Sequence, residues 1–167
     1  PGGPRLITKG AFHHVLEICT TLDDGTPLDD AGRDALEAHY AEWSGHGIRV
    51  LAVATRTLAR DATPGHDDEG ALAFAGFLTF IDRPKEGVER AIADLSELGV
   101  AVKMITGDNR LVASHLARLV GLRADRVLTG RQLDELHDEA LWHAAEQTDV
   151  FAEVDPNQKE RIILSLK

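Results

Sequence analysis

The sequence is poor in the features that mark secreted, membrane-spanning and nucleic-acid-binding proteins. Its 167 residues include one cysteine, Cys19, which excludes an internal disulfide and fits a reducing compartment. No signal peptide opens it, and no apolar run approaches the roughly 20 residues of a membrane-spanning helix. Basic residues are scarce, because 28 Asp and Glu against 18 Lys and Arg give a net charge of −10. We therefore expect a soluble, cytosolic body that binds no nucleic acid.

The usual catalytic signatures are absent as well. The chain has no Gly-x-Ser-x-Gly segment and no G-x-x-x-x-G-K-[ST] loop, so any phosphate chemistry is not that of a P-loop enzyme. Its eight histidines include no helical pair with a third carboxylate ligand of the zinc type. We therefore expect no metal site made by this chain alone.

The most informative segment is Val100–Gly121, VAVKMITGDNRLVASHLARLVG. It predicts a buried strand over Val100–Ile105, a polar turn over Thr106–Asn109 and then an amphipathic helix. Such a turn offers unpaired backbone N–H groups and the positive end of a helix dipole to an anion. Thr106 adds a hydroxyl donor, whereas Asp108 beside a phosphate needs a counter-charge or structural hydrogen bonds. The segment is suited to hold a phosphoryl group beside a counter-charge.

Two interpretations of this turn stay open. In the structural one, Thr106 or Asp108 caps the helix by accepting backbone N–H bonds, and Gly107 tolerates a positive φ. In the functional one, the turn binds phosphate together with Lys159, which lies just inside a helix that begins at Pro156. A lysine this early in a helix opposes the helix dipole, which favours a functional role.

The second half of the chain alternates regularly between helices and strands. The expected elements are helix Glu86–Leu98, strand Val100–Ile105, helix Leu111–Val120, strand Arg126–Leu128, helix Gln132–Gln147, strand Val150–Ala152 and a helix after Pro156. Apolar strands between helices indicate a parallel sheet covered on both faces. Ligands of such sheets bind beyond the carboxyl ends of the strands. We expect Thr106–Asn109 and the loop after Ala152 to lie there.

The first half is typical of a smaller α+β assembly. Its expected elements are strand Arg5–Thr8, helix Ala11–Thr20, helix Asp30–Ser44 with Asp30 as N-cap, strand Ile48–Thr55 and a long buried strand Leu72–Ile81. Arg60–Gly70 is polar and predicts a loop. Asp82–Lys85 contains a proline and suits a hinge between two bodies. Arg49 stands out, because a charge in an apolar strand normally has a partner or a ligand.

These segments occur together, in this order, in one family. The chain resembles the cytoplasmic catalytic region of a P-type cation-transporting ATPase, from the middle of the nucleotide-binding domain into the phosphorylation domain. The matching stretches are Lys9-Gly10-Ala11, Gly47 to Ala52, Gly76 to Lys85, Met104 to Asn109, Val150 to Ala152 and Pro156 to Lys159. The Gly-Phe-Leu-Thr-Phe run and the Asn after Thr-Gly-Asp are most similar to the magnesium-transporting branch.

The resemblance implies an α/β fold in two parts. Residues 1–81 would form part of an α+β nucleotide-binding domain, and residues 82–167 part of a haloacid-dehalogenase-like parallel sheet with flanking helices. It also implies a cytoplasmic domain of an integral protein of the plasma or inner membrane. In that family ATP phosphorylates an aspartate, and hydrolysis of the acyl phosphate drives cation transport. ATP and Mg²⁺ would be the cofactors, and the partners would be the remaining domains of the same polypeptide and the transported cation.

The resemblance also assigns roles to residues. Those implied to bind nucleotide are Lys9 and Gly10 at the adenosine, Arg49 at the phosphates and Asp82 at the hinge. Those implied to hold the transferring phosphoryl group are Thr106, Gly107, Asp108 and Lys159. Lys159 would neutralise charge that develops on this group, an electrostatic role suited to the loose transition state of phosphoryl transfer.

The sequence also departs from the family. It lacks the Asp-Lys-Thr-Gly-Thr motif that carries the phosphorylated aspartate and the Gly-Asp-Gly-x-Asn-Asp motif that carries magnesium-binding acids. Arg83 replaces the usual first proline of the hinge. With no initiator methionine, the chain is expected to be an inactive piece of a longer protein, whose magnesium ligands lie elsewhere. Its open sheet edges suggest a fragment dimer as a hypothesis.

Two alternatives to the pump are left open by these observations. A soluble phosphatase of the same haloacid-dehalogenase-like fold also uses a Thr or Ser after an apolar strand and a downstream lysine. It needs an N-terminal Asp-x-Asp, which is absent, and has no need of Lys9 or Arg49. A non-catalytic nucleotide-binding or regulatory module is favoured by the missing nucleophile.

Overall fold

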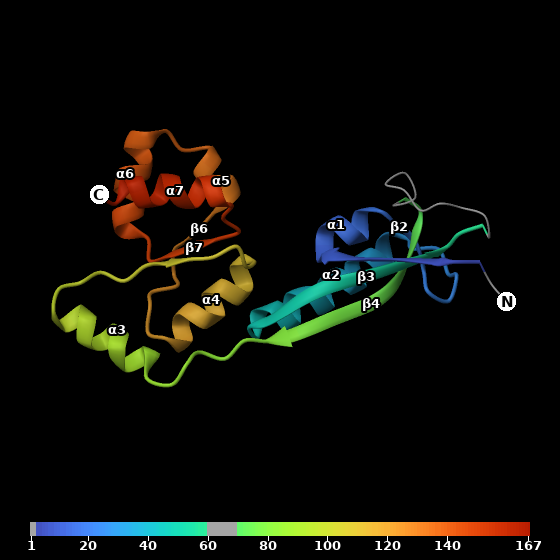
Figure 1. Ribbon diagram of the computed structural model, residues 1–167, viewed down its shortest axis with the longest axis horizontal. Coiled ribbons are helices and arrows are strands. Elements are labelled where there is room, and N and C mark those ends of the chain that lie inside the picture. Colours follow the sequence, from blue (N-terminus) through green and yellow to red (C-terminus); the bar gives the residue numbers. More distant parts are fainter. Residues whose placement is uncertain (1–2, 60–69) are drawn as a thin grey trace. The chain divides into compact units, whose positions relative to one another are not determined.

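The computed structural model describes residues 3–59 and 70–167 (Figure 1). The loop expected over Arg60–Gly70 therefore lies almost entirely outside the described residues. The chain divides into two compact units, one made of residues 1–43 and 50–80 and the other of residues 44–49 and 81–167. Within the described ranges, no helix combines the length and the apolar character that a membrane crossing requires.

A four-stranded sheet in the order β1-β3-β4-β2 forms the first unit. Its elements are β1 (Arg5–Ala11), α1 (Phe12–Glu17), β2 (Cys19–Leu22), α2 (Asp30–Gly45), β3 (Ile48–Thr57) and β4 (Leu72–Ile81). β1 pairs with β3 in antiparallel orientation, and β2 pairs with β4 in parallel orientation. Phe12 of α1 and Tyr40 of α2 are buried and stack with ring centroids 4.5 Å apart, which joins the two helices in one core.

The helix expected over Ala11–Thr20 is wrong at both ends. β1 continues to Ala11, and the chain returns to a strand at Cys19, where the β-branched Thr20 and Thr21 favour extended backbone. The expected inward face is confirmed, because its four residues are at most 5% exposed: Phe12, Val15, Leu16 and Cys19. The N-cap of α2 is also one residue earlier than expected, because the Asp29 carboxylate accepts the Gly32 N–H at 2.8 Å.

β4 has the expected bounds but is buried only in its first half. Leu72 and Phe74 are buried, whereas Phe80 and Ile81 are 47% and 67% exposed. Gly76 has a φ of 144°, a conformation that glycine adopts readily. Phe74 and Phe77, on opposite sides of this glycine, contact each other with centroids 5.1 Å apart although alternate strand positions should separate them. Gly76 therefore changes which side chains face the core.

The second unit is a parallel sheet between two layers of helices. Its strands, in the spatial order β5-β7-β6, are β5 (Met104–Ile105), β6 (Val127–Thr129) and β7 (Val150–Ala152). Its helices are α3 (Val88–Glu97), α4 (Arg110–Leu119), α5 (Gly130–Asp134), α6 (Asp138–Gln147) and α7 (Pro156–Ser165). In Figure 1, α5, α6 and α7 lie on one side of β6 and β7, and α4 lies on the other. The expected parallel α/β sheet is confirmed.

Each face of this sheet has its own core. On one face, Phe151 packs with buried residues of the three C-terminal helices, among them Leu133, Leu141 and Ile162. On the other face, Val150 packs with Ala113 of α4. Alternate residues of a strand point to opposite faces, so the continuous apolar run of β7 serves both cores.

Two expected elements of the second unit differ from the structure. Of the strand expected over Val100–Ile105, only Met104–Ile105 forms a strand, β5. In the described part of the chain β5 pairs with β7 alone, so few residues are held in extended conformation by a partner. The helix expected over Gln132–Gln147 divides into α5 and α6. At the break, Arg161 of α7 donates to the carbonyls of Leu133 and Leu136, which satisfies groups that a continuous helix would pair internally.

The outer side of β5 has no strand partner in the described part of the chain. An apolar hollow of about 350 Å³ lies beside it, lined among others by Val88 and Ile92 of α3, by Leu116 of α4 and by Val120 at the C-cap of α4. α3 itself has no buried residue. Apolar side chains of this helix therefore remain in contact with solvent beside the strand that leads into the Thr106 turn.

Candidate functional site

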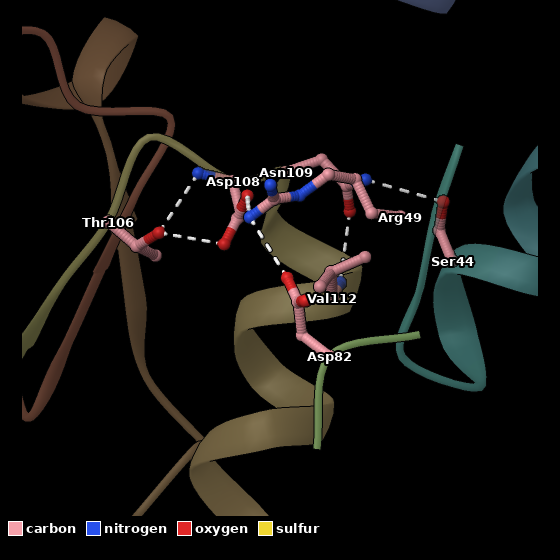
Figure 2. Close-up of polar contacts among 7 residues, drawn as sticks. All are labelled: Ser44, Arg49, Asp82, Thr106, Asp108, Asn109 and Val112. Atoms are coloured by element: carbon pink, nitrogen blue, oxygen red, sulfur yellow. Dashed lines mark hydrogen bonds and ion pairs between the residues drawn. The ribbon is translucent and has the colours of Figure 1, made fainter. Parts of the chain in front are cut away.

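The Thr106–Asn109 turn follows β5 directly, at the carboxyl end of the strand, as expected. The Thr106 hydroxyl accepts the Asp108 N–H at 3.1 Å and donates to the Asp108 carboxylate at 3.0 Å (Figure 2). Asn109 is the N-cap of α4, because its side-chain oxygen accepts the Val112 N–H at 3.0 Å. The structural interpretation, with Thr106 or Asp108 as helix cap, is therefore wrong, although Thr106 accepts a backbone N–H within the turn.

The backbone conformation at position 107 does not require glycine. Its φ is not positive, contrary to expectation. A Cβ built at this position would meet only the Val154 carbonyl oxygen, at 3.6 Å. The fold therefore tolerates a side chain here, and the bare backbone at the exposed point of the turn is left accessible to a ligand.

Arg49 supplies the counter-charge that Asp108 requires. Its guanidinium lies 2.5 Å from one carboxylate oxygen of Asp108 and 3.4 Å from a carboxylate oxygen of Asp82 (Figure 2). The Asp108 side chain is 19% exposed and that of Arg49 is 44% exposed. Arg49 thus lies at the exposed start of β3, so the argument from a buried charge was wrong. The expectation that Arg49 has a partner is confirmed, because Asp82 and Asp108 both pair with its guanidinium.

Asn109 makes a second contact that sequence reasoning missed. Its side-chain amide donates to the hydroxyl of Ser44, a fully buried residue near the end of α2, at 3.3 Å. Figure 2 shows Ser44 and Arg49 approaching the turn from the same segment of chain. An Asn directly before a helix is a recognisable N-cap signal, whereas nothing local in the sequence marks Ser44.

The loop after β7 lies against the turn, which confirms that both occupy one edge of the sheet. The Thr106 N–H donates to the Phe151 carbonyl at 2.9 Å, and the Val154 N–H donates to the Thr106 carbonyl at 3.1 Å. The Glu153 N–H donates to the Asp108 carbonyl at 2.9 Å. Main-chain hydrogen bonds therefore fix the turn to the segment that leads into α7.

Lys159 lies in the first turn of α7, as expected from the proline at its start. Asp155 caps this helix, and its carboxylate accepts the N–H groups of Asn157 at 2.7 Å and Gln158 at 2.9 Å. Lys159 is exposed, and it has no ion pair within the described ranges. Its ammonium group is therefore available to an anion, unlike the guanidinium of Arg49.

Some backbone donors of the turn and of the start of α4 are bonded within the protein. The Asp108 N–H is taken by Thr106, and the Arg110 N–H is taken by the Glu153 carboxylate at 3.0 Å. Among the residues that the structure describes, the N–H groups of Gly107, Asn109 and Leu111 have no hydrogen-bond partner. The expectation of unpaired N–H groups at this turn is therefore confirmed, although the neighbouring donors of Asp108 and Arg110 are occupied.

Lys9 and Gly10 belong to the first unit, inside β1 rather than at its end. Lys9 is exposed and lies opposite Val53 of β3. A Cβ built on Gly10 would contact only Val15 Cγ2, at 3.5 Å, which is an ordinary contact. The fold therefore does not require glycine at position 10.

The residues that the structure describes do not form a magnesium site. Within residues 3–59 and 70–167, no three His, Cys, Asp or Glu side chains gather in a way that would hold a metal ion. Asp82 and Asp108 both face the cationic Arg49. A divalent cation would have to displace this guanidinium and find its other ligands elsewhere.

A second charged cluster lies at the opposite end of the strands, just before β7. Arg123 donates to both carboxylate oxygens of Asp149, at 2.7 and 3.1 Å, and the Lys103 ammonium lies 3.7 Å from the same carboxylate. These hydrogen bonds from Arg123 hold the pKa of Asp149 below its ordinary value. The Lys103 ammonium also donates to the Thr148 carbonyl at 2.8 Å, so this cluster braces the sheet away from the turn.

Comparison with known proteins gives matches over nearly the whole chain. A family model described as P-type ATPase, cytoplasmic domain N, matches residues 1–87. The chain is 38% identical over 172 residues to magnesium-transporting ATPase, P-type 1, of Salmonella typhimurium, which covers 99% of the chain and 19% of the relative. It is 36% identical over 167 residues to the Escherichia coli K12 protein of that name, covering 98% and 19%.

A more distant relative carries a different name. The chain is 31% identical over 164 residues to calcium-transporting ATPase type 2C member 2 of Rattus norvegicus, which covers 95% of the chain and 16% of the relative. The chain thus spans about a fifth of the length of the curated relatives it matches. The family-model match and these identities show that the chain belongs to the P-type cation-transporting ATPases.

Proposed function

We propose that this chain is a cytoplasmic part of an ATP-driven, membrane-embedded cation pump that works through an aspartyl phosphate. Residues 1–81 would belong to its nucleotide-binding domain, and residues 82–167 to a phosphorylation domain with a haloacid-dehalogenase-like sheet. Magnesium is the proposed cation, because the relatives named for magnesium are 36–38% identical to the chain and the one named for calcium is 31% identical.

The single observation that carries the proposal is the pairing of the turn with the α7 loop. Thr106, Gly107 and Asp108 follow β5, Lys159 follows β7, and these strands are parallel neighbours. Three main-chain hydrogen bonds join the turn to β7 and to the loop that follows it. A hydroxyl, a bare backbone segment and a free cation at one sheet edge are what a phosphoryl group needs.

In the proposed reaction, a carboxylate outside this sequence attacks the γ-phosphorus of ATP. The bond from phosphorus to the bridging oxygen breaks, ADP leaves, and water later cleaves the acyl phosphate to release inorganic phosphate. Thr106, Gly107 and Asp108 would orient the transferring group, and Lys159 would stabilise charge on its oxygens. The described residues gather no magnesium site, and the family resemblance assigns the ligands of the Mg²⁺ that accompanies ATP to parts of the protein outside this chain.

The nucleotide itself would contact Lys9 and Gly10 at the adenosine, and Arg49 and Asp82 nearer the phosphates. A soluble phosphatase does not account for the family-model match over residues 1–87. Because the sequence lacks Asp-Lys-Thr-Gly-Thr, we expect the chain alone to bind ATP without hydrolysing it.

Isothermal titration calorimetry of the 167-residue chain with ATP and Mg²⁺ tests this function. We expect measurable binding that Lys9→Ala and Arg49→Ala each weaken about tenfold, as loss of a hydrogen bond to a charged group predicts. Arg131→Ala is the matched control, because this arginine is 91% exposed and pairs only loosely with Glu135. Absence of ATP binding by the native chain, or an equal loss in the control, would overturn the proposal.

A further inference from the structure

We infer that Glu153 is a positioning residue that holds the Thr106–Asp108 turn in place from the opposite loop. Its effect on the turn follows from contacts in the structure, whereas the consequence for phosphate binding rests on the proposed function. Glu153 was not among the residues that the sequence pointed to, and no motif marks it.

The backbone of Glu153 is in an unfavourable conformation. Its φ is +58°, and Ala71 is the one other non-glycine residue with positive φ in the described part of the chain. Left-handed backbone is disfavoured for residues with a β-carbon, so it persists where surrounding contacts enforce it. Residues with this conformation cluster where a site requires a fixed geometry. The contacts of Glu153 should therefore explain why its conformation is maintained.

Glu153 bonds to the turn on both sides of Asn109. Its N–H donates to the Asp108 carbonyl at 2.9 Å, and its carboxylate accepts the Arg110 N–H at 3.0 Å. The second bond places an anionic acceptor at the first residue of α4, where backbone donors lack helical partners. Together the two bonds fix the end of the turn that carries Asp108 and the start of the helix behind it.

The Glu153 loop is itself held from the other side. A Cβ built on Gly130 would lie 2.4 Å from the Glu153 carbonyl oxygen and 2.4 Å from Gln158 Oε1, so α5 packs directly against this loop. The Gln158 side-chain amide donates to the Gly130 carbonyl at 3.1 Å. Because Gln158 precedes Lys159 on α7, the same contacts fix the start of the helix that carries the lysine.

The charge of Glu153 argues that it orients the turn and does not bind the anion. A carboxylate beside a phosphoryl group repels it, and this one also occupies an N–H that an anion would use. The side chain therefore acts through its acceptor oxygen, which binds the Arg110 N–H, and not through its charge. Glu153→Gln keeps an acceptor of the same reach without the charge, and Glu153→Ala removes both.

Amide hydrogen exchange of the 167-residue chain, measured residue by residue by NMR, tests the inference without nucleotide. In Glu153→Ala we expect the Arg110 N–H to exchange about tenfold faster or more, while core amides such as Phe151 keep their protection. Glu153→Gln should retain most of the native protection at Arg110. Glu135→Ala, at the exposed C-cap of α5, is the matched control and should leave Arg110 unchanged.

Calorimetry with ATP then gives the functional consequence. Affinity should fall several-fold in Glu153→Ala and stay native or improve in Glu153→Gln. Unchanged exchange at Arg110 in Glu153→Ala, or equal loss in the Ala and Gln variants, would overturn the positioning role. A native chain that binds no ATP would overturn the proposed function and leave the exchange result standing. If Glu153→Ala does not fold, Glu153→Asn replaces it, because Asn tolerates left-handed backbone but is one methylene too short for Arg110.

Discussion

Arg49 and Asp108 form an ion pair with nitrogen and oxygen 2.5 Å apart, and Thr106 hydrogen-bonds to the other oxygen of the same carboxylate. The cation assigned to the nucleotide phosphates is thus bound to a carboxylate of the assigned phosphoryl site. Any anion that recruits Arg49 must compete with Asp108. Because of this competition, substitutions of Arg49 and of Asp108 are expected to change ATP affinity in opposite directions.

Asp108→Asn is expected to tighten ATP binding, whereas Arg49→Ala weakens it. Because Arg49 is substantially exposed, the pair contributes about 0.2–1 kcal/mol, so the gain is between about 1.4-fold and fivefold. Calorimetry at low ionic strength should show the gain, and added salt should reduce it. Weaker binding by Asp108→Asn would contradict the competition and indicate that this carboxylate contacts the ligand directly.

Gly47→Ala is expected to destabilise the chain. Gly47 has a φ of 78°, and a Cβ there would lie 2.4 Å from the His115 ring. Backbone strain and this clash together predict a loss of about 1–3 kcal/mol in the free energy of unfolding, measured by urea titration. Gly45→Ala is the control, because nothing lies within 4 Å of its added Cβ. Equal stability of the two variants would contradict the prediction.

Asp149→Asn is expected to lower stability by about 1 kcal/mol at neutral pH, because Arg123 loses a charged acceptor but is itself 70% exposed. The pKa of Asp149 is lowered from its ordinary value of 3.8. Its contribution is therefore present above that value and is lost as the pH falls through the lower pKa of the folded state. Urea titrations at about pH 7 and pH 3 should show that the difference between native and variant narrows in acid.

The neighbouring Asp125→Asn serves as the control for Asp149→Asn. It also removes one acidic charge near Arg123, but the charge of Asp125 has only a small electrostatic effect on the pKa of Arg123. A pH-independent difference between native and Asp149→Asn, or the same loss in Asp125→Asn, would contradict the assignment.

Gly10→Ala separates binding from folding. The added methyl meets only Val15 at 3.5 Å, so stability should be unchanged or slightly higher, since alanine restricts the unfolded chain. ATP affinity should fall if the bare backbone lies against the nucleotide as proposed. Thermal unfolding and calorimetry on the same sample check both parts. Unchanged affinity would remove Gly10 from the site.

A fragment dimer through the outer edge of β5 stays a prediction. In the described ranges β5 has a strand partner on one side alone, and the hollow beside it is apolar. Exposed strand edges of this kind favour pairing with a second copy. Light scattering over a range of concentrations should show mass increasing with concentration, and a single monomeric species throughout would contradict it.

Strong local signals predicted much of the fold. The run VFA at 150–152 was recognised as a strand buried on both faces, and Pro156 marked the start of α7 to the residue. Where one pattern continued through a change of structure, prediction failed. The helical pattern across Leu136 hid a break made by Arg161, 25 residues away in sequence, and the apolar run around Gly76 hid a change of buried face.

The candidate site was predictable only where residue type and position suffice. Thr106, Asp108 and Lys159 follow predicted strands, and the topology of a parallel sheet brings their loops to one edge. Arg49 was singled out for its charge, but its partners Asp82 and Asp108 depend on tertiary contacts. Ser44 and Glu153 act through a hydroxyl and a strained backbone, neither of which leaves a local pattern.

The strand order β5-β7-β6 gives the two halves of the site unequal resistance to local opening. β7 is central and its three residues are fully buried, whereas β5 is a two-residue edge strand with partly exposed side chains. Edge elements with few contacts open at lower free energy than central ones. The Thr106 half should therefore fluctuate away from the sheet while the Lys159 half remains folded. Lys159 would then hold an anion in a fixed position, and the Thr106 turn would close on it.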